Sequence, residues 1–180
     1  MASPFGKGVV SGVRLLLVDG YNVIRQTPPY RELAEHDLES ARAALVSDVA
    51  AYADRSFDAT VVFDAHLNPS SNGVPHHVAG ITVVFSRHGT DADAVIESLA
   101  RAARERGADT VVVTSDAQTQ WVVLGGTVVR MSSPEFAGEL RAQDSEWREH
   151  SPAGSMRGRL EDRVDAHTRE RLSRWARGEA

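Results

Sequence analysis

The chain has 180 residues and a formal net charge of −5, with 42% hydrophobic and 25% charged residues, as expected for one globular domain with a buried core. It contains no cysteine, which excludes disulfide bonds, cysteine nucleophiles and thiolate metal sites. No apolar run approaches the ~20 residues that span a bilayer. Residues 1–12 lack the apolar stretch of a secretory signal. We therefore expect a cytoplasmic protein without a membrane partner.

The first half of the chain alternates apolar runs with polar segments. Val13–Val18 is an apolar run interrupted only by Arg14, which is typical of a strand buried on both faces of a sheet. A pair of prolines predicts a loop over residues 26–36. Leu38–Ala53 carries apolar residues at three- and four-residue steps, which predicts an amphipathic helix with Asp37 as its N-cap. A second apolar strand follows at Ala59–Phe63.

The middle of the chain repeats this alternation. Asn, Ser, Pro and Gly residues predict a loop over Leu67–His77, and a third strand follows at Ile81–Phe85. Asp91–Arg106 has the periodicity of a helix, which Gly107 ends. Thr110–Thr114 is a fourth apolar strand.

The last predicted elements of the domain complete a sheet covered on both faces. A short helix is expected over Asp116–Leu124, and a fifth strand over Thr127–Met131. Ser133-Pro134 opens a helix over Glu135–Arg148, because proline is favoured at the first helical position. Apolar strands that alternate with helices predict an α/β fold with a mainly parallel five-stranded sheet.

The C-terminal part of the chain differs in charge from the rest. Residues 1–150 hold 13 Lys/Arg and 20 Asp/Glu, whereas residues 151–180 hold seven Arg and five Asp/Glu. We predict an acidic domain over 1–150 and an Arg-rich extension over 151–180, helical over Arg159–Arg177. The extension either contributes affinity for RNA through its arginines or packs Leu172 and Trp175 on the domain.

Aspartates lie at the carboxyl ends of several predicted strands. Asp19, Asp64 and Asp116 directly follow or close strands, and Asp91 and Asp93 begin the helix after the third strand. Ligand sites of open parallel sheets form outside the carboxyl ends of the strands, so we expect these side chains to converge. One such aspartate alone is typically a turn or cap residue. Several on one edge repel each other unless a cation neutralises them, and oxygen clusters suit Mg²⁺ or Mn²⁺.

Neighbouring residues allow two interpretations each. Asp91 precedes the first apolar residue of its helix, so we assign it to the N-cap and Asp93 to the metal. Glu97, one turn later, is either a further acid of the metal site or the ion-pair partner of Arg101. Asn22 is either a turn residue or a neutral side chain that holds a phosphate or the attacking water.

Four motifs in fixed order resemble a known family. They are Asp19-Gly20-Tyr21-Asn22, Val62-Phe63-Asp64-Ala65, Gly89-Thr90-Asp91-Ala92-Asp93 with Ile96-Glu97, and Thr114-Ser115-Asp116 with Gln120. In this order and spacing they resemble the YacP-like NYN domains of the PIN-like nuclease group, over about Leu15–Glu146. The resemblance implies a PIN-like three-layer α/β/α sandwich that cleaves single-stranded RNA with Mg²⁺ or Mn²⁺. It also implies that some members associate with ribosomes or translated messages.

The resemblance also implies roles for individual residues. The implied acids of the metal site are Asp19, Asp93 and Asp116, with Asp64 close by. Asn22 would complete the catalytic set, and Ser115 would be a supporting polar group that contacts the substrate. The family's usual Glu-Thr-Ala-Asp segment is here Thr90-Asp91-Ala92-Asp93, so Asp91 could compete with Asp93 as the ligand. The Arg-rich extension lies outside the resemblance.

The predicted function is that of a metal-dependent endoribonuclease, with RNA and the ribosome as expected partners. Arg87 and His88 either contact RNA phosphates or are exposed loop charges. A phosphatase of the haloacid-dehalogenase type would use Asp19 as nucleophile, but Tyr21 stands where such enzymes carry a second aspartate. An RNA- or ribosome-binding adaptor with weak or no catalysis is disfavoured, because clustered carboxylates repel phosphate. The absence of Gly-x-Gly-x-x-Gly after the first strand disfavours a dinucleotide-binding protein.

Overall fold

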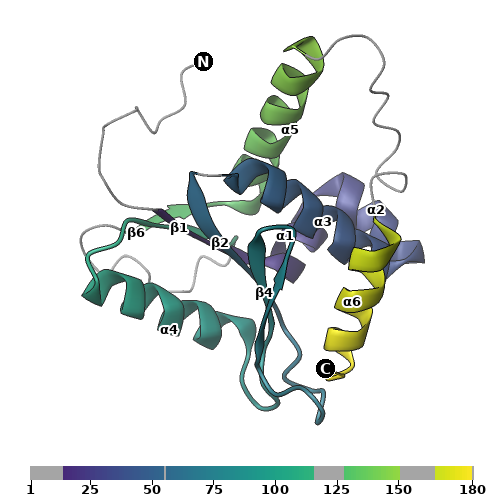
Figure 1. Ribbon diagram of the computed structural model, residues 1–180, viewed down its shortest axis with the longest axis vertical. Coiled ribbons are helices and arrows are strands. Elements are labelled where there is room, and N and C mark those ends of the chain that lie inside the picture. The colour runs from purple at the N-terminus through teal and green to yellow at the C-terminus, as the bar shows by residue number, and fades with distance from the viewer. Residues whose placement is uncertain (1–13, 55, 116–127, 151–164, 180) are drawn as a thin grey trace.

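The computed structural model describes residues 14–54, 56–115, 128–150 and 165–179, and six strands in these ranges form one sheet in the order β3-β4-β2-β1-β5-β6 (Figure 1). All neighbouring strands are parallel except the edge strand β3, which is antiparallel to β4. The strands are Arg14–Asp19 (β1), Phe57–Phe63 (β2), Pro75–Val78 (β3), Ile81–Phe85 (β4), Thr110–Val113 (β5) and Val128–Met131 (β6). The predicted α/β fold with a mainly parallel sheet is confirmed, with one strand more than the five expected.

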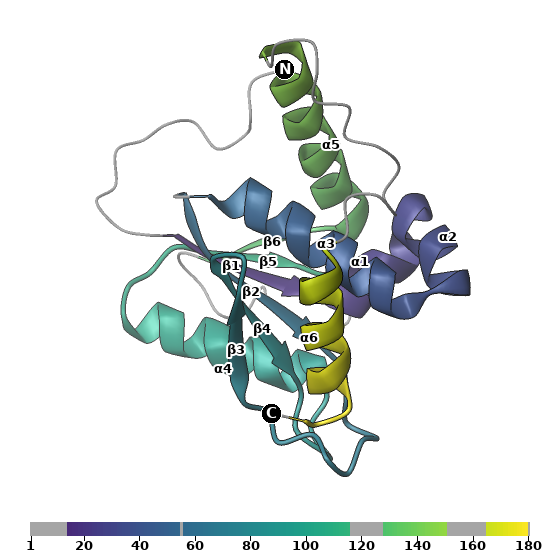
Figure 2. The ribbon, with the colours of Figure 1, turned by 45° about the vertical axis from the view of Figure 1, so that its right-hand side comes forward.

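Helices cover both faces of this sheet, which gives three layers (Figures 1 and 2). Helix α4 packs on one face, and α1, α3 and α5 lie on the other. The helices are Gly20–Gln26 (α1), Pro28–His36 (α2), Leu38–Ala53 (α3), Ala92–Glu105 (α4), Ser133–His150 (α5) and Ala166–Ala176 (α6). Within the described ranges, no helix has the length and apolar content needed to cross a membrane.

The central strands consist mostly of consecutive apolar residues because both of their faces are buried. Along β1, Leu16 and Val18 belong to the cluster that includes α3, whereas Leu17 packs with Ile96 of α4. Each of these side chains is at most 1% exposed. Burying one Leu or Val side chain contributes about 1.5–3 kcal/mol, so the central strands are held firmly between the two helical layers.

The predicted loop over residues 26–36 is wrong, since most of it is helix α2. Pro28 and Pro29 occupy the first positions of this helix. Proline is tolerated there because the first N–H groups of a helix have no partner within it. The proline pair therefore marks where a helix begins, and not a loop.

The predicted loop over Leu67–His77 is partly wrong, because its last residues enter β3. Val78 and Ile81 are joined by Ala79 and Gly80, both of which have positive φ angles (53° and 84°). Two such residues form the tight turn that suits an antiparallel hairpin. Pro75 lies on the edge strand, where the missing N–H costs no ladder hydrogen bond.

The C-terminal helix α6 packs on α3 and on the β3–β4 hairpin (Figure 2). Leu172 is fully buried, and the ring of Trp175 stacks on His76 with ring centroids 4.1 Å apart. The Ser173 hydroxyl donates to Glu39 of α3. Of the two interpretations of the Arg-rich extension, the structure shows packing for residues 165–179. The predicted short helix over Asp116–Leu124 lies outside the described residues.

Candidate active site

Asp19 closes β1, and helix α1 begins at the next residue. The Asp19 carboxylate caps this helix, because its Oδ1 accepts a hydrogen bond of 3.0 Å from the Asn22 N–H. A Cβ atom at Gly20 would lie only 2.4 Å from Cε1 of the Phe63 ring. Glycine therefore lets the chain turn from strand to helix against this ring, which fixes the Asp19 carboxylate at the end of the strand.

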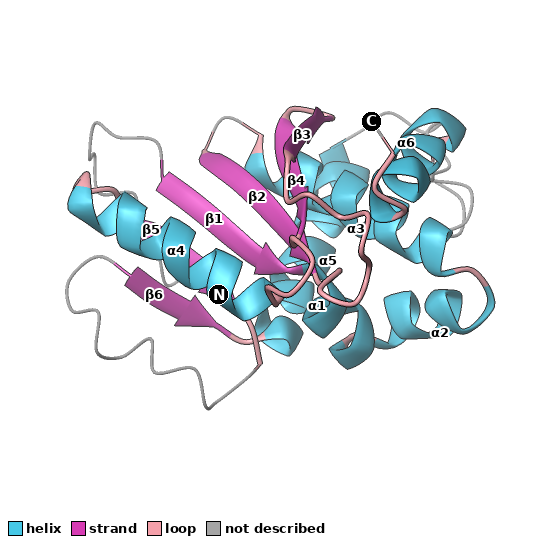
Figure 3. Ribbon diagram, turned by 90° about the horizontal axis from the view of Figure 1, so that it is seen from below, coloured by secondary structure: helices cyan, strands magenta, loops and turns pink. Residues whose placement is uncertain are grey.

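The surroundings of Asp19 disfavour its negative charge. The side chain is 8% exposed, and burial raises its pKa to about 6. The Asn22 N–H and Arg25 lower this pKa, while the carboxylates of Asp93 and Asp64 raise it. The three aspartates thus lie close enough to interact electrostatically, although they come from β1, from the segment after β2 and from α4. Figure 3 shows β1 and β2 ending at this side of the sheet, next to α1. We call the group of Asp19, Asp64 and Asp93 the acidic edge.

The two aspartates at the start of α4 occupy different positions. Asp91 is exposed, and its Oδ1 accepts a hydrogen bond of 2.8 Å from the Ala94 N–H. Asp93 lies in the first turn and its Oδ1 is buried. Asp91 is thus the N-cap, as the sequence suggests. Glu97 is exposed and accepts a hydrogen bond of 2.6 Å from Arg101, so the structure shows the ion-pair alternative for this residue.

Asp64 is paired with a histidine that the sequence did not single out. Its Oδ1 accepts a hydrogen bond of 2.9 Å from the His66 N–H and lies 2.5 Å from Nδ1 of the same residue. The Ser86 hydroxyl lies 3.5 Å away. Burial would raise the pKa of Asp64, but the hydrogen bonds from His66 and Ser86 outweigh it and lower the pKa. Asp64 therefore brings a largely compensated charge to the acidic edge.

Asn22 connects the end of β1 to two other elements. Its Oδ1 accepts hydrogen bonds from the Ser115 N–H (3.0 Å) and from the Ser133 hydroxyl (2.7 Å). The Ser133 N–H in turn donates to the Ser115 hydroxyl (3.1 Å), and Ser133 is fully buried. Sequence reasoning treated Ser133 only as part of the start of a helix. Its partners are 18 and 111 residues away, so no local signal identified it.

Asp116, the remaining predicted acid, lies outside the described residues; it follows Ser115 in the chain. In the described ranges, no three His, Asp or Glu side chains form a group that could hold a metal ion. The donor chemistry nevertheless fits a hard cation. Asp19 is a buried carboxylate whose pKa is raised by its burial and by two neighbouring carboxylates. A divalent cation with oxygen ligands would offset these effects.

An open cleft of about 530 Å³ adjoins the acidic edge. We call it the arginine cleft; it is lined by Tyr21, Arg25, Arg42, Asp64, Ala65, His66, Leu67, Asn68, Phe85 and Ala176. Arg42, which the sequence analysis missed, reaches it from α3. The two residues predicted to contact RNA, Arg87 and His88, are exposed in the loop between β4 and α4 and are not part of its lining.

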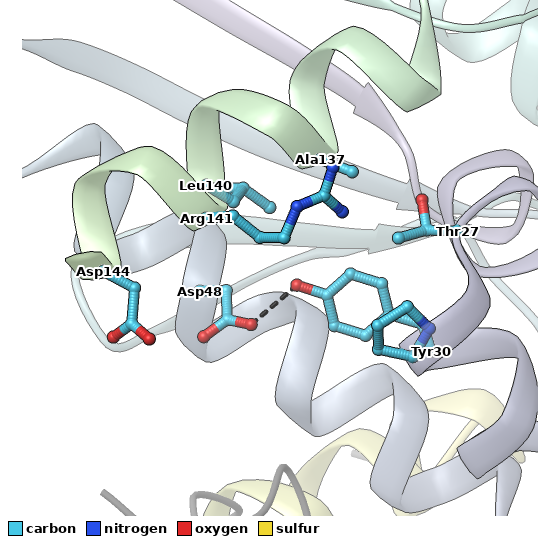
Figure 4. A pocket seen from close by; sticks show the side chains of 8 residues that line it. Thr27, Tyr30, Asp48, Ala137, Leu140, Arg141 and Asp144 are labelled. Carbon is cyan, nitrogen blue, oxygen red and sulfur yellow. Dashed lines mark hydrogen bonds between the residues drawn. The ribbon is translucent and has the colours of Figure 1, made fainter.

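Another pocket, of about 180 Å³, lies between α2, α3 and α5 (Figure 4). Its lining includes Tyr30, whose hydroxyl points to Asp48 and donates a hydrogen bond of 2.6 Å. None of the residues predicted for the site lines this pocket. The arginine cleft is thus the hollow that continues from the acidic edge.

Comparison with known proteins gives one consistent result. The family model of the YacP-like NYN domain matches residues 16–177. The uncharacterised protein YacP of Bacillus subtilis (strain 168) is 35% identical over 129 residues, which are 70% of this chain and 74% of that protein. The match to the family model extends beyond Glu146, so the expectation that the C-terminal extension lies outside the resemblance is wrong.

Solved structures agree with the sequence comparison. The crystal structure of Rae1 (YacP) from Bacillus subtilis has a TM-score of 0.62 and 28% sequence identity, and the match covers 92% of this chain and 96% of that one. The crystal structure of a point mutant of the same Bacillus protein also has a TM-score of 0.62 and 28% identity, over 89% and 98% of the two chains. The similarity therefore extends over nearly the whole chain.

Proposed function

Because this chain belongs to the YacP-like NYN family, which has a PIN-like nuclease fold, we propose that it is a metal-dependent endoribonuclease acting on single-stranded RNA. The family supports a nuclease-type hydrolase in general. The observation that carries the finer proposal is the acidic edge, where burial and neighbouring carboxylates raise the pKa of Asp19 to about 6. Folds of this type bind ligands at the carboxyl ends of their parallel strands, and the acidic edge lies at these ends.

The proposed cofactor is Mg²⁺ or Mn²⁺, in keeping with the divalent metals that PIN-like nucleases generally use. We assign its ligands to Asp19, Asp93 and Asp116, with Asp64 beside them. When bound, the ion supplies Lewis-acid polarisation of a phosphoryl oxygen and lowers the pKa of a water molecule. The raised pKa of Asp19 supports this assignment, because a nearby cation favours the ionised form.

The protein's own residues hold the carboxylates in place. The Asn22 N–H orients Asp19, and the Asn22 side chain binds Ser115 and Ser133. Asn22 thereby fixes the end of β1 against the residue that precedes Asp116 in the chain. The Ser115 hydroxyl accepts from the Ser133 N–H, so its own hydrogen can be donated to a substrate oxygen. We therefore keep Asn22 in the catalytic set as a positioning group and Ser115 as a contact to RNA.

Further substrate contacts are assigned to Arg87 and His88. Both are exposed and stand in the loop that leads from β4 to the start of α4, where Asp91 and Asp93 lie. Phosphate contacts of this kind position a nucleic acid without reading its sequence. We also propose the ribosome as a partner, and we place the activity in the cytoplasm, where translated RNA is found.

The experiment that tests this function incubates the purified protein with mixed single-stranded RNAs and with translating ribosomes, in Mn²⁺ or in EDTA, and maps the cut ends. We expect cuts only with Mn²⁺, and none with Asp19→Asn. Asp37→Asn is the matched control, because Asp37 is also an N-cap aspartate but lies at the start of α3. Binding without cleavage in every condition would favour the adaptor. Hydrolysis of p-nitrophenyl phosphate would favour the phosphatase.

A further inference from the structure

Arg42 carries an uncompensated charge next to the acidic edge. It lies on α3, is half-buried, and lines the arginine cleft. Among the residues that the structure describes, no carboxylate forms an ion pair with it. A charged group that is partly removed from water costs free energy unless a partner compensates it. This cost indicates that Arg42 is placed for an anion that binds in the cleft.

Tyr21 fixes the orientation of the Arg42 guanidinium. Its hydroxyl accepts hydrogen bonds from Nε (2.9 Å) and Nη2 (2.7 Å) of Arg42. The guanidinium carbon lies 5.5 Å from the centre of the Tyr21 ring and 5.8 Å from that of Phe85. These contacts restrain the side chain without neutralising it, and the other terminal nitrogen, Nη1, has no partner among the described residues. A restrained guanidinium loses less conformational entropy when it binds an anion.

The arginine cleft has the position and size for a segment of the substrate. Asp64 lines it and also interacts with Asp19, so the cleft begins where the acidic edge ends. Arg25 adds a second cation to the lining. A volume of about 530 Å³ lies within the usual range for a bound small ligand. An RNA strand presents one phosphate per nucleotide, so a phosphate at the acidic edge brings a neighbouring one towards this cleft.

Resting on the function proposed above, we propose that the arginine cleft binds the nucleotide next to the scissile phosphate. Arg42 binds the backbone phosphate of that nucleotide, and Tyr21 is a positioning residue that holds Arg42. The cleft thus supplies attraction for RNA beside a group of carboxylates that would otherwise repel it. The ligand class is a phosphodiester of single-stranded RNA.

The test measures binding of a fluorescein-labelled 12-nucleotide single-stranded RNA by fluorescence anisotropy over a series of salt concentrations. All proteins are full-length and carry Asp19→Asn, so that cleavage does not interfere. We compare Arg42→Gln, Arg42→Lys and Tyr21→Phe with Arg104→Gln. Arg104 is an exposed arginine in the last turn of α4 and is absent from the cleft. Thermal melts check that each variant is folded.

We expect Arg42→Gln to raise Kd about tenfold, the usual effect of losing a hydrogen bond to a charged group. The slope of log K against log salt should fall by about 0.7, as for one lost phosphate contact on a single strand. Arg42→Lys should keep this slope with an intermediate Kd. Tyr21→Phe should raise Kd several-fold with the slope unchanged, and Arg104→Gln should bind normally. A purely structural role of Arg42 would not change the salt slope.

Two results separate this inference from the proposed function. If the parent, which carries Asp19→Asn alone, binds the RNA and the Arg42→Gln variant has the same Kd and salt slope, the phosphate site is refuted. The proposed nuclease function is then unaffected. If Arg42→Gln weakens binding but the protein with Asp19 intact cuts no RNA, the site stands and the nuclease is refuted. If the parent binds no RNA at all, both are refuted.

Discussion

Replacing Asp19 by asparagine should stabilise the metal-free protein at neutral pH. Burial and the neighbouring carboxylates raise the pKa of Asp19 from 3.8 to about 6. One pH unit of such a shift corresponds to about 1.4 kcal/mol, so the ionised side chain destabilises the folded state by about 3 kcal/mol. Since the side chain is 8% exposed, solvent screening reduces this value little. Asparagine keeps the oxygen that accepts from the Asn22 N–H but carries no charge.

The pH dependence of this effect has a defined sign. A carboxyl group with a raised pKa binds its proton more tightly in the folded chain than in the unfolded chain. Its contribution to stability is therefore complete below pH 3.8 and is lost as the pH rises to about 6. The Asp19→Asn variant should be as stable as the unmodified protein near pH 4 and more stable above pH 6. For a domain of this length the advantage corresponds to roughly 6–12 °C in Tm.

Thermal and urea unfolding, followed by circular dichroism in EDTA between pH 4.5 and 7.5, measure this difference. Asp37→Asn is the control, because hydrogen bonds from Ser40 lower the pKa of that N-cap aspartate. This variant should lose stability at neutral pH. The reasoning fails if Asp19→Asn is less stable than the parent at pH 7.5 and its stability has the same pH profile. Asp19 would then be a helix cap only.

Three further changes test the metal site, the strand-to-helix turn and the C-terminal helix. Mn²⁺ at 100 times its Kd should stabilise the unmodified protein by about 2.7 kcal/mol and the Asp19→Asn variant by little. If Mn²⁺ raises the Tm of both proteins equally in thermal melts, the proposed metal site is contradicted. Gly20→Ala should lower the free energy of unfolding in urea by about 1–3 kcal/mol, because the new Cβ meets the buried Phe63 ring. The control Gly138→Ala should not lower it, because nothing lies within 4 Å of a Cβ at that position. Leu172→Ala should lower the free energy of unfolding by about 2–5 kcal/mol, whereas Leu38→Ala should change it little because Leu38 is 40% exposed. If the two variants have equal unfolding midpoints, α6 does not stabilise the domain.

Features that depend on neighbouring residues could be predicted from the sequence. The apolar runs gave the positions of the parallel strands, because a strand buried on both faces needs apolar residues at every position. The N-caps Asp37 and Asp91 were predicted correctly, since each binds an N–H three residues along the chain. The sequence also indicated that carboxylates from separate strands meet at one edge, because parallel strands end on the same side.

Features that depend on distant partners could not be predicted in this way. The Ser133 hydroxyl meets Asn22 only because β1 and the start of α5 are brought together by the sheet. Arg42 is an ordinary charged residue of a helix until Tyr21 and Phe85 are placed beside it. His66 gave no signal either, although it pairs with an aspartate only two residues before it. A short polar loop allows many arrangements, and the sheet selects one.

The hydrogen-bond and ion-pair partners of each acid bear on which residues would bind the proposed metal ion. Asp91 caps a helix, Glu97 is paired with Arg101, and Asp64 is hydrogen-bonded to His66, so protein groups already compensate these charges. Asp19 also receives a hydrogen bond, from the start of α1, yet this bond does not outweigh its burial and its acidic neighbours. The charge left uncompensated on Asp19 is the one that a divalent cation would stabilise most. Burial favours Asp93, whose Oδ1 is removed from solvent, over the exposed helix cap Asp91 as the second ligand of the proposed cation.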